Sequence, residues 1–177
     1  MRMALSLLAF CLLINTTSDA QAQGHHIQGL RPEVHAGIGF QGFLSAGFDL
    51  EFAIVPDGFL RGMDDELALA AGFDLLFADF GRYHDRDDPR GVGFAPNLTA
   101  QWNIYLSDKW SVFPEAGFTV LILTEGTHRY YRRHGRGGRA GYVDAVVGVG
   151  ARLHMGRRFA LVFRLGYPFG AQIGLNF

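Results

Sequence analysis

A strict alternation of apolar and other side chains at the C-terminal end of the chain is the feature that most constrains its fold. One parity of this segment is entirely apolar and consists of Ala171, Ile173, Leu175 and Phe177. The other parity consists of Gln172, Gly174 and Asn176. Because successive side chains of a strand point to opposite faces, this pattern predicts a strand with one face in an apolar medium. The run 158–166 alternates in the same way, so the two segments together predict a β-hairpin.

The same alternation recurs upstream and predicts six more strands. These predicted strands span residues 32–41, 44–54, 66–77, 97–106, 110–123 and 141–154. Short turns separate some of them, whereas two long charged segments, 79–93 and 124–140, separate others. Eight strands place both termini at one end, and the two long segments then lie at the opposite end. After the N-terminal region, no apolar run approaches the roughly 20 residues that a spanning helix needs. A closed barrel satisfies its backbone hydrogen bonds between strands, so the fold class expected is all-β.

Two local features in or next to the fifth predicted strand lead to further expectations. Pro114 has no N–H to donate to a neighbouring strand, which predicts a bulge or a strand end there. Tyr105, Trp110 and Phe113 flank the short turn around Asp108, which is typical of aromatic residues at a membrane–water boundary.

The N-terminus has the pattern of a secretory signal peptide. Arg2 precedes an apolar core, and Ala20 and Ala22 provide the small residues of a cleavage site. We therefore expect a signal peptide over residues 1–22, a short lead-in over 23–31 and a barrel domain over 32–177. Cys11 is the only cysteine, so the exported chain has no disulfide.

With its alternating strands and terminal Phe177, the chain resembles the small bacterial outer-membrane barrels of the OmpA/OmpX type. The resemblance implies an eight-stranded, antiparallel, up-and-down transmembrane β-barrel that is exported to the bacterial outer membrane and contacts its lipids. It also implies that the outer-membrane assembly machinery recognises the C-terminal strand, with Phe177, Leu175 and Ile173 as the assembly signal.

Charged residues on the non-apolar parity are the first candidate functional set, because in a membrane barrel they face the lumen. They are Asp49, Glu51, Glu66, Asp74, Glu115, Asp144, Arg152, Arg158 and Arg164. His35 and His154 share this parity. Buried charges need partners, so the set predicts a salt-bridged plug that fills the lumen. An ion path or a carboxylate-based active site is the functional alternative.

An arginine-rich loop is the second candidate. It holds Arg129, Arg132, Arg133, Arg136 and Arg139. Guanidinium groups bind phosphates bidentately, and the phosphates on the outer face of such a membrane belong to lipopolysaccharide. A solvated loop without a ligand is the simpler interpretation. The net charge of −1 gives no general attraction to nucleic acid, and the sequence predicts no cofactor, no metal site and a monomer.

Two rival functions make different demands on the residues. A lipid-modifying barrel enzyme needs a nucleophile, yet Ser45, Ser107 and Ser111 have no histidine within a few positions in sequence. Only a histidine from another strand could pair with one of them, so we expect no enzymatic activity. A soluble, exported, lipocalin-like barrel binding an apolar ligand requires the apolar parity to face inward instead. The small residues of the polar parity favour the membrane alternative.

Overall fold

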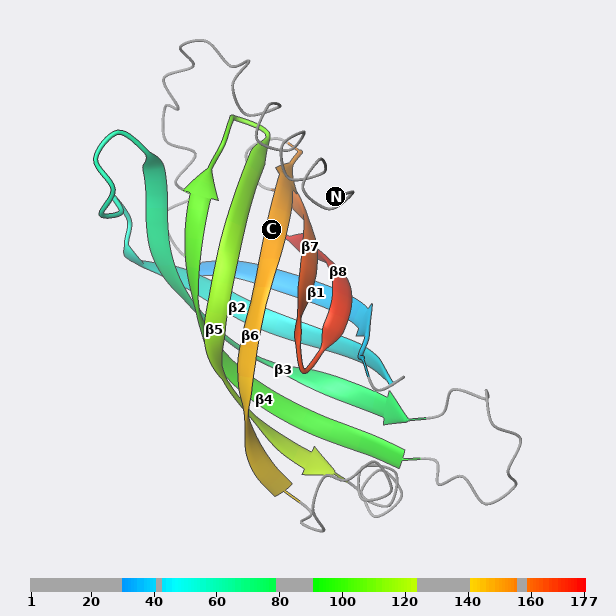
Figure 1. The fold of residues 1–177 in the computed structure, drawn as a ribbon. Helices are drawn as coiled ribbons and strands as arrows, with labels where there is room; N and C mark the ends of the chain where they lie inside the picture. Colours follow the sequence, from blue (N-terminus) through cyan, green and yellow to red (C-terminus); the bar gives the residue numbers. More distant parts are fainter. Residues whose placement is uncertain (1–29, 41–42, 79–90, 124–140, 156–158) are drawn as a thin grey trace, which may run out of the picture.

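The computed structural model describes residues 30–40, 43–78, 91–123, 141–155 and 159–177, and these form a closed β-barrel (Figure 1). Each strand pairs antiparallel with the next, and β1 pairs with β8 to close the barrel. The strands are β1 (Leu30–Ile38), β2 (Leu44–Val55), β3 (Asp64–Ala78), β4 (Gly91–Tyr105), β5 (Trp110–Leu123), β6 (Gly141–His154), β7 (Ala160–Tyr167) and β8 (Gly170–Asn176). The predicted eight-stranded, antiparallel, up-and-down all-β barrel is therefore confirmed. Figure 1 shows the strands tilted, so that β5, β6 and β7 run across β1 and β2.

In the described part of the chain, there is no helix long and apolar enough to cross a membrane.

The alternation of side chains sets which face of each strand turns inward. In β1, for example, Arg31, Glu33 and His35 are buried, whereas Leu30 before them and Val34 between Glu33 and His35 are exposed. On the other strands, the large apolar side chains of the apolar parity are likewise at the outer surface, including Phe118, Val147 and Leu165. Within the described barrel, the apolar parity faces outward and the polar parity inward.

The last strand is joined to the first at the chain termini. Glu33 pairs with Asn176, and the backbone N–H of Phe177 donates to the carbonyl oxygen of Pro32 at 2.9 Å. The ends of β1 and β8 thus lie together at what we call the terminal end of the barrel. The turns that precede Leu44 and follow Tyr167 lie at the opposite end, which we call the far end.

Several strand boundaries differ from the sequence prediction. β1 begins at Leu30, and β4 begins at Gly91 rather than near residue 97. The prediction of a bulge or a strand end at Pro114 is wrong, because β5 extends from Trp110 to Leu123 and keeps one continuous register with β6 through Pro114 and Val149. A shift in register occurs instead between β2 and β3, at Ala53 and Val55.

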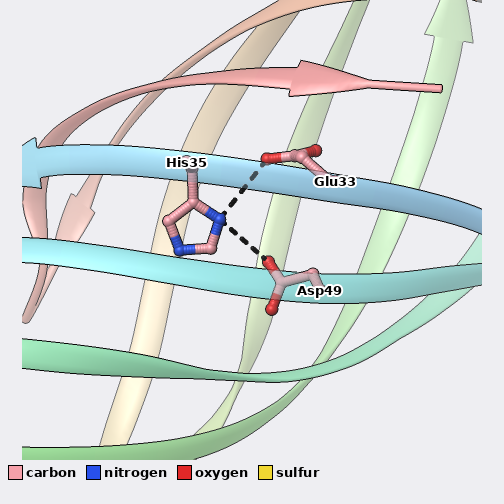
Figure 2. A group of neighbouring side chains, drawn as sticks. All are labelled: Glu33, His35 and Asp49. Carbon is pink, nitrogen blue, oxygen red and sulfur yellow. Dashed lines mark ion pairs between the residues drawn. The ribbon is translucent and has the colours of Figure 1, made fainter.

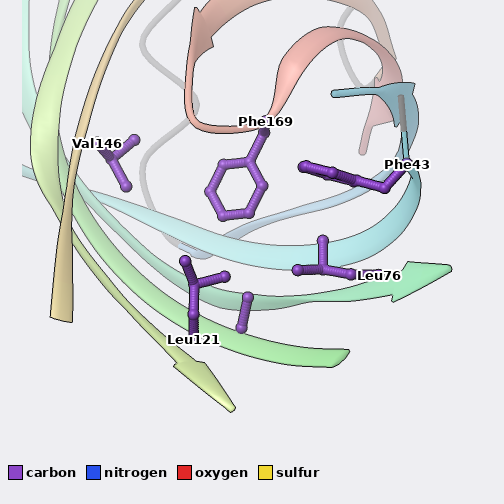
Figure 3. Packing of buried hydrophobic residues seen from close by; sticks show 6 residues of the cluster. Phe43, Leu76, Leu121, Val146 and Phe169 are labelled. Carbon is purple, nitrogen blue, oxygen red and sulfur yellow. The ribbon is translucent and has the colours of Figure 1, made fainter. Parts of the chain in front are cut away.

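The far end of the lumen is filled by an apolar cluster. It comprises Phe43, Leu76, Ala95, Leu121, Val146 and Phe169. Figure 3 shows the rings of Phe169 and Phe43 side by side above Leu76 and Leu121. The lumen is therefore not polar throughout, as the alternation alone suggested. It has an apolar layer at the far end and charged layers nearer the termini.

At two positions on the inward parity, glycine leaves space that a neighbouring side chain or backbone group occupies. A Cβ at Gly150 would clash with the ring of Phe113, its partner across the β5–β6 ladder. A Cβ at Gly117 would clash with the backbone carbonyl oxygen of Leu98 on β4. These glycines let the walls and the filling side chains approach closely.

Candidate functional site

Two arginines from opposite walls of the barrel meet two glutamates near the terminal end. Arg152 on β6 lies 2.8 Å from a carboxylate oxygen of Glu51 on β2, and Arg31 on β1 lies 2.9 Å from the other oxygen. Arg31 also forms an ion pair with Glu66 on β3. β2 and β6 are not neighbours in the sheet, so the Arg152–Glu51 pair crosses the lumen. Two guanidinium groups here face two carboxylates.

Neutral side chains complete the surroundings of Arg152. It donates hydrogen bonds to the side-chain oxygens of Gln101 at 2.7 Å and Asn103 at 2.5 Å. Its guanidinium carbon lies 4.3 Å from the ring centroid of Phe113, a cation–π contact. The prediction that Phe113 lies at the membrane boundary is therefore wrong, since its side chain is 1% exposed. Trp110, which lies on the outward parity, is 42% exposed.

Arg164 on β7 binds a second group of acids, nearer the middle of the lumen. One of its terminal nitrogens lies 2.6 Å from Glu33 Oε1 and 3.3 Å from Asp49 Oδ2. Its Nε lies 3.6 Å from Glu115 Oε2 on β5. Three carboxylates from three strands therefore surround one guanidinium group.

His35 extends this second group toward the far end. Its Nε2 lies 3.1 Å from Asp74 Oδ1, within hydrogen-bond distance. Its Nδ1 faces the opposite way, 3.8 Å from Glu33 Oε1 and 3.7 Å from Asp49 Oδ2 (Figure 2). Gln172 on β8 also donates to Asp74, at 3.0 Å. The imidazole ring is thus held between Asp74 on one side and two carboxylates on the other.

The structure places the sequence-predicted lumen residues as follows. Seven of the nine take part in these two groups: Asp49, Glu51, Glu66, Asp74, Glu115, Arg152 and Arg164. Asp144 lies elsewhere on β6 and accepts a 2.7 Å hydrogen bond from the hydroxyl of Tyr167. Arg158 and the five arginines of the 124–140 segment lie outside the described residues.

Two central members of the network were not among the predicted site residues. Glu33 and Arg31 are 1% and 5% exposed and pair with arginine and glutamate side chains, respectively. The signal was present, because both share the parity of His35 in β1. Arg31 was instead expected in the lead-in, directly before the first predicted strand. No metal site was foreseen either, yet one donor atom from each of Glu33, His35 and Asp49 lies within 4.8 Å of the others.

A serine and a histidine meet across the β5–β6 ladder. Ser111 Oγ lies 3.0 Å from His154 Nε2, a contact that local sequence spacing could not reveal. The ring of His154 also lies 6.0 Å from that of Tyr105. Ser111 has no exposed surface. Because the hydroxyl is fully buried in the described part of the chain, this geometry favours a structural hydrogen bond over a nucleophilic role.

An acidic side chain on the outward parity is also buried, by the connection between β2 and β3. Asp65 accepts a hydrogen bond from the indole N–H of Trp102 at 2.8 Å, and from the backbone N–H groups of Phe59 and Leu60 at 3.3 Å each. The rings of Phe59 and Trp102 lie 5.7 Å apart. Phe59 and Leu60 remain 56% and 40% exposed, so this connection presents apolar groups around a hydrogen-bonded carboxylate.

Comparisons with known proteins do not assign the chain to a family. No protein-family model matches it, and no curated protein matches it. One similar solved structure is described as "De novo design of transmembrane beta-barrels", with a TM-score of 0.48 and 13% sequence identity. The match covers 84% of this chain and 92% of that one.

Proposed function

We propose that this chain is a non-enzymatic outer-membrane β-barrel protein of the OmpA/OmpX type, with a structural or surface-contact role. The observation that carries the proposal is the inside-out distribution of side chains. Val143, Val147 and Leu165 are 68%, 59% and 54% exposed, whereas Glu33, Glu51 and Glu66 are at most 2% exposed. A lipid environment stabilises such an exterior, whereas a soluble lipocalin-like barrel requires the reverse arrangement.

The lumen is proposed to be plugged rather than open. Side chains fill the interior of an eight-stranded barrel. Arg152 and Arg164 reach across this lumen to acids on β1 and β2, and the apolar cluster fills its far end. Solute passage would require these contacts to separate. The barrel therefore acts as a rigid anchor for the segments that it displays.

The proposed topology follows from the lengths of the connections. The short connections between β4 and β5 and between β6 and β7 lie at the terminal end of the barrel, which we assign to the periplasm. The 79–90 and 124–140 segments then emerge at the cell surface. The arginines at 129, 132, 133, 136 and 139 would there meet lipopolysaccharide phosphates, which guanidinium groups bind bidentately.

Export and assembly complete the proposal. Residues 1–22 direct the chain across the inner membrane and are removed. The outer-membrane assembly machinery then recognises the last strand through Phe177, Leu175 and Ile173. All three side chains are exposed on the lipid-facing parity, at 47%, 43% and 51%. Neither nucleic acid nor a cofactor has a part in this role.

Fractionation of the expressed protein tests the membrane assignment. We expect the chain in the outer-membrane fraction, with a band that shifts in electrophoresis when the sample is boiled. Val147→Arg should reduce the folded fraction, because arginine on the lipid face near the bilayer centre costs about 2–4 kcal/mol. Asp57→Arg, in the exposed β2–β3 connection, is the control and should fold like the wild type. Recovery of the wild type as a soluble protein would refute the proposal.

The lipopolysaccharide contact needs a separate measurement. A variant with serine at the five arginine positions 129, 132, 133, 136 and 139 should bind lipopolysaccharide vesicles more weakly than the wild type. The boiling-shifted band shows that the variant barrel is folded. Unchanged binding by a folded variant would eliminate the loop as a lipopolysaccharide site and leave the anchor role intact.

A further inference from the structure

The two halves of the lumen network differ in their charge balance. Near the termini, Arg31 and Arg152 balance Glu51 and Glu66. The second group contains four carboxylates, one guanidinium and one imidazole: Glu33, Asp49, Asp74, Glu115, Arg164 and His35. Its formal charge is −3 with a neutral histidine and −2 with a protonated one. Uncompensated charge is costly inside a protein, so this group has room for a further cation.

Three donor atoms of this group converge. His35 Nδ1 lies 3.8 Å from Glu33 Oε1 and 3.7 Å from Asp49 Oδ2 (Figure 2). All three atoms lie within 4.8 Å of one another. Ligands at about 2.0–2.1 Å from a tetrahedral ion lie about 3.4 Å apart, so the distance from His35 Nδ1 to each carboxylate oxygen is within a few tenths of an ångström of that value. The three residues come from adjacent strands, since Glu33 of β1 pairs with Asp49 of β2.

A second, independent observation points to a ligand at the same place. His35 Nδ1 has no hydrogen-bond partner, although the side chain is only 2% exposed. Buried polar atoms normally have partners. The nitrogen that lacks one here faces the two carboxylates.

Asp74 orients the imidazole for this role. With Asp74 Oδ1 at 3.1 Å, a neutral His35 that donates its proton from Nε2 to this carboxylate has a lone pair on Nδ1. Histidines that bind metals almost always donate their other N–H in this way, and the carboxylate fixes the ring. Gln172 donates to the same Asp74 oxygen at 3.0 Å, which holds that carboxylate in turn.

We propose that Glu33, His35 and Asp49 form a binding site for one divalent transition-metal ion inside the barrel. The donors are one imidazole nitrogen and two carboxylate oxygens, a set suited to Zn²⁺ and its first-row neighbours. Calcium and magnesium prefer oxygen alone. The site goes beyond an anchoring role and does not depend on the membrane assignment, because all three residues lie within the barrel itself.

Arg164 competes with the metal for the same oxygens. Its terminal nitrogen lies 2.6 Å from Glu33 Oε1, so a bound dication would repel it. Glu115 offers an alternative partner, since its Oε2 already lies 3.6 Å from Arg164 Nε. Metal binding should therefore accompany a shift of the guanidinium group toward Glu115. Replacing Arg164 with glutamine should tighten metal binding.

Metal content of the purified, folded full chain tests the site directly. After treatment with a chelator and exposure to Zn²⁺ alone, we expect one bound ion per chain by elemental analysis. Co²⁺ in its place should give visible absorption bands of a mixed nitrogen and oxygen site. His35→Gln should lose the bound ion, and Asp74→Asn should weaken binding by roughly 10- to 100-fold. Asp144→Asn, an acid of the same barrel outside the group, is the control and should bind like the wild type.

The results of these experiments distinguish a metal site from a charge network that binds protons but no metal ion. A folded wild type that binds no Zn²⁺ or Co²⁺ would overturn the proposal, as would His35→Gln or Glu33→Gln binding as tightly as the wild type. If His35→Gln does not fold, the Co²⁺ spectrum of the wild type and the affinity of Arg164→Gln for Zn²⁺ still test the proposal. A spectrum without nitrogen coordination, or weaker binding by Arg164→Gln, would also overturn it.

Discussion

Replacing Arg152 with methionine tests whether the charged lumen stabilises the barrel. Methionine keeps an unbranched apolar stem but removes the guanidinium group. The substitution breaks the 2.8 Å ion pair with Glu51 and the hydrogen bonds to Gln101 at 2.7 Å and Asn103 at 2.5 Å. It also removes the cation–π interaction with Phe113. Glu51 keeps its ion pair with Arg31, so its carboxylate loses one of two guanidinium partners.

The expected destabilisation can be estimated from these interactions. Hydrogen bonds to charged groups contribute about 1.5–3 kcal/mol each, and breaking one buried ion pair costs about 3–5 kcal/mol. These contributions overlap because one guanidinium makes them all. We therefore expect Arg152→Met to lower the free energy of unfolding by about 3–5 kcal/mol. Adding Glu51→Gln should recover about 1–3 kcal/mol, since Arg31 and Glu66 then balance each other.

Urea unfolding of the barrel in phospholipid vesicles measures these changes. Tryptophan fluorescence reports the transition, and electrophoresis without boiling reports the folded fraction. Arg61→Met is the matched control, because Arg61 lies in the exposed β2–β3 connection and its replacement should change stability by about 0.5 kcal/mol or less. A destabilisation below about 1 kcal/mol for Arg152→Met would refute the reasoning, as would strictly additive effects in the double variant.

Two further substitutions probe the wall of the barrel. Gly117→Ala should strongly reduce the folded fraction in electrophoresis without boiling, because the added Cβ would clash with the carbonyl oxygen of Leu98. Gly141→Ala is its control and should fold normally, since the nearest atom to its Cβ lies at 3.5 Å; equal folding of the two variants would contradict this. Trp102→Phe removes the indole donor to Asp65 and should lower the free energy of urea unfolding by about 1–3 kcal/mol. No measurable change would mean that solvent replaces this bond.

The fold was predictable because a barrel repeats one simple pattern. Alternation over 7 to 15 residues in each strand fixed the strand number and the inward parity. The predicted strand boundaries were wrong where a strand contains residues that are typical of loops. Proline at position 96 and glycines at 91 and 93 are typical of a loop, yet all lie within β4. Neither Pro96 nor Pro114 shifts the register of β4 with β5.

The candidate site was predictable in membership but not in pairing. Parity shows that Asp49 and Arg164 face the same interior. It does not show that they are in contact, because the stagger between strands decides which side chains lie at the same level along the barrel axis. Arg164 and Glu33 are 131 positions apart. Parity also does not predict that apolar side chains lie on the inward face. Leu76 and Leu121 follow the polar parity and still form an apolar layer.

The same limitation explains why the charge excess of the lumen is invisible in the sequence. The full chain has a net charge of −1, which suggests near balance. Only the register of the barrel shows that the charges form two groups. In one group two arginines balance two glutamates, and in the other the carboxylates outnumber the cations. In that group, Arg164 alone cannot satisfy Glu33, Asp49 and Glu115, and His35 already faces Asp74. A cation is therefore favoured at His35 Nδ1 because of where the strands align, although no local motif marks the site.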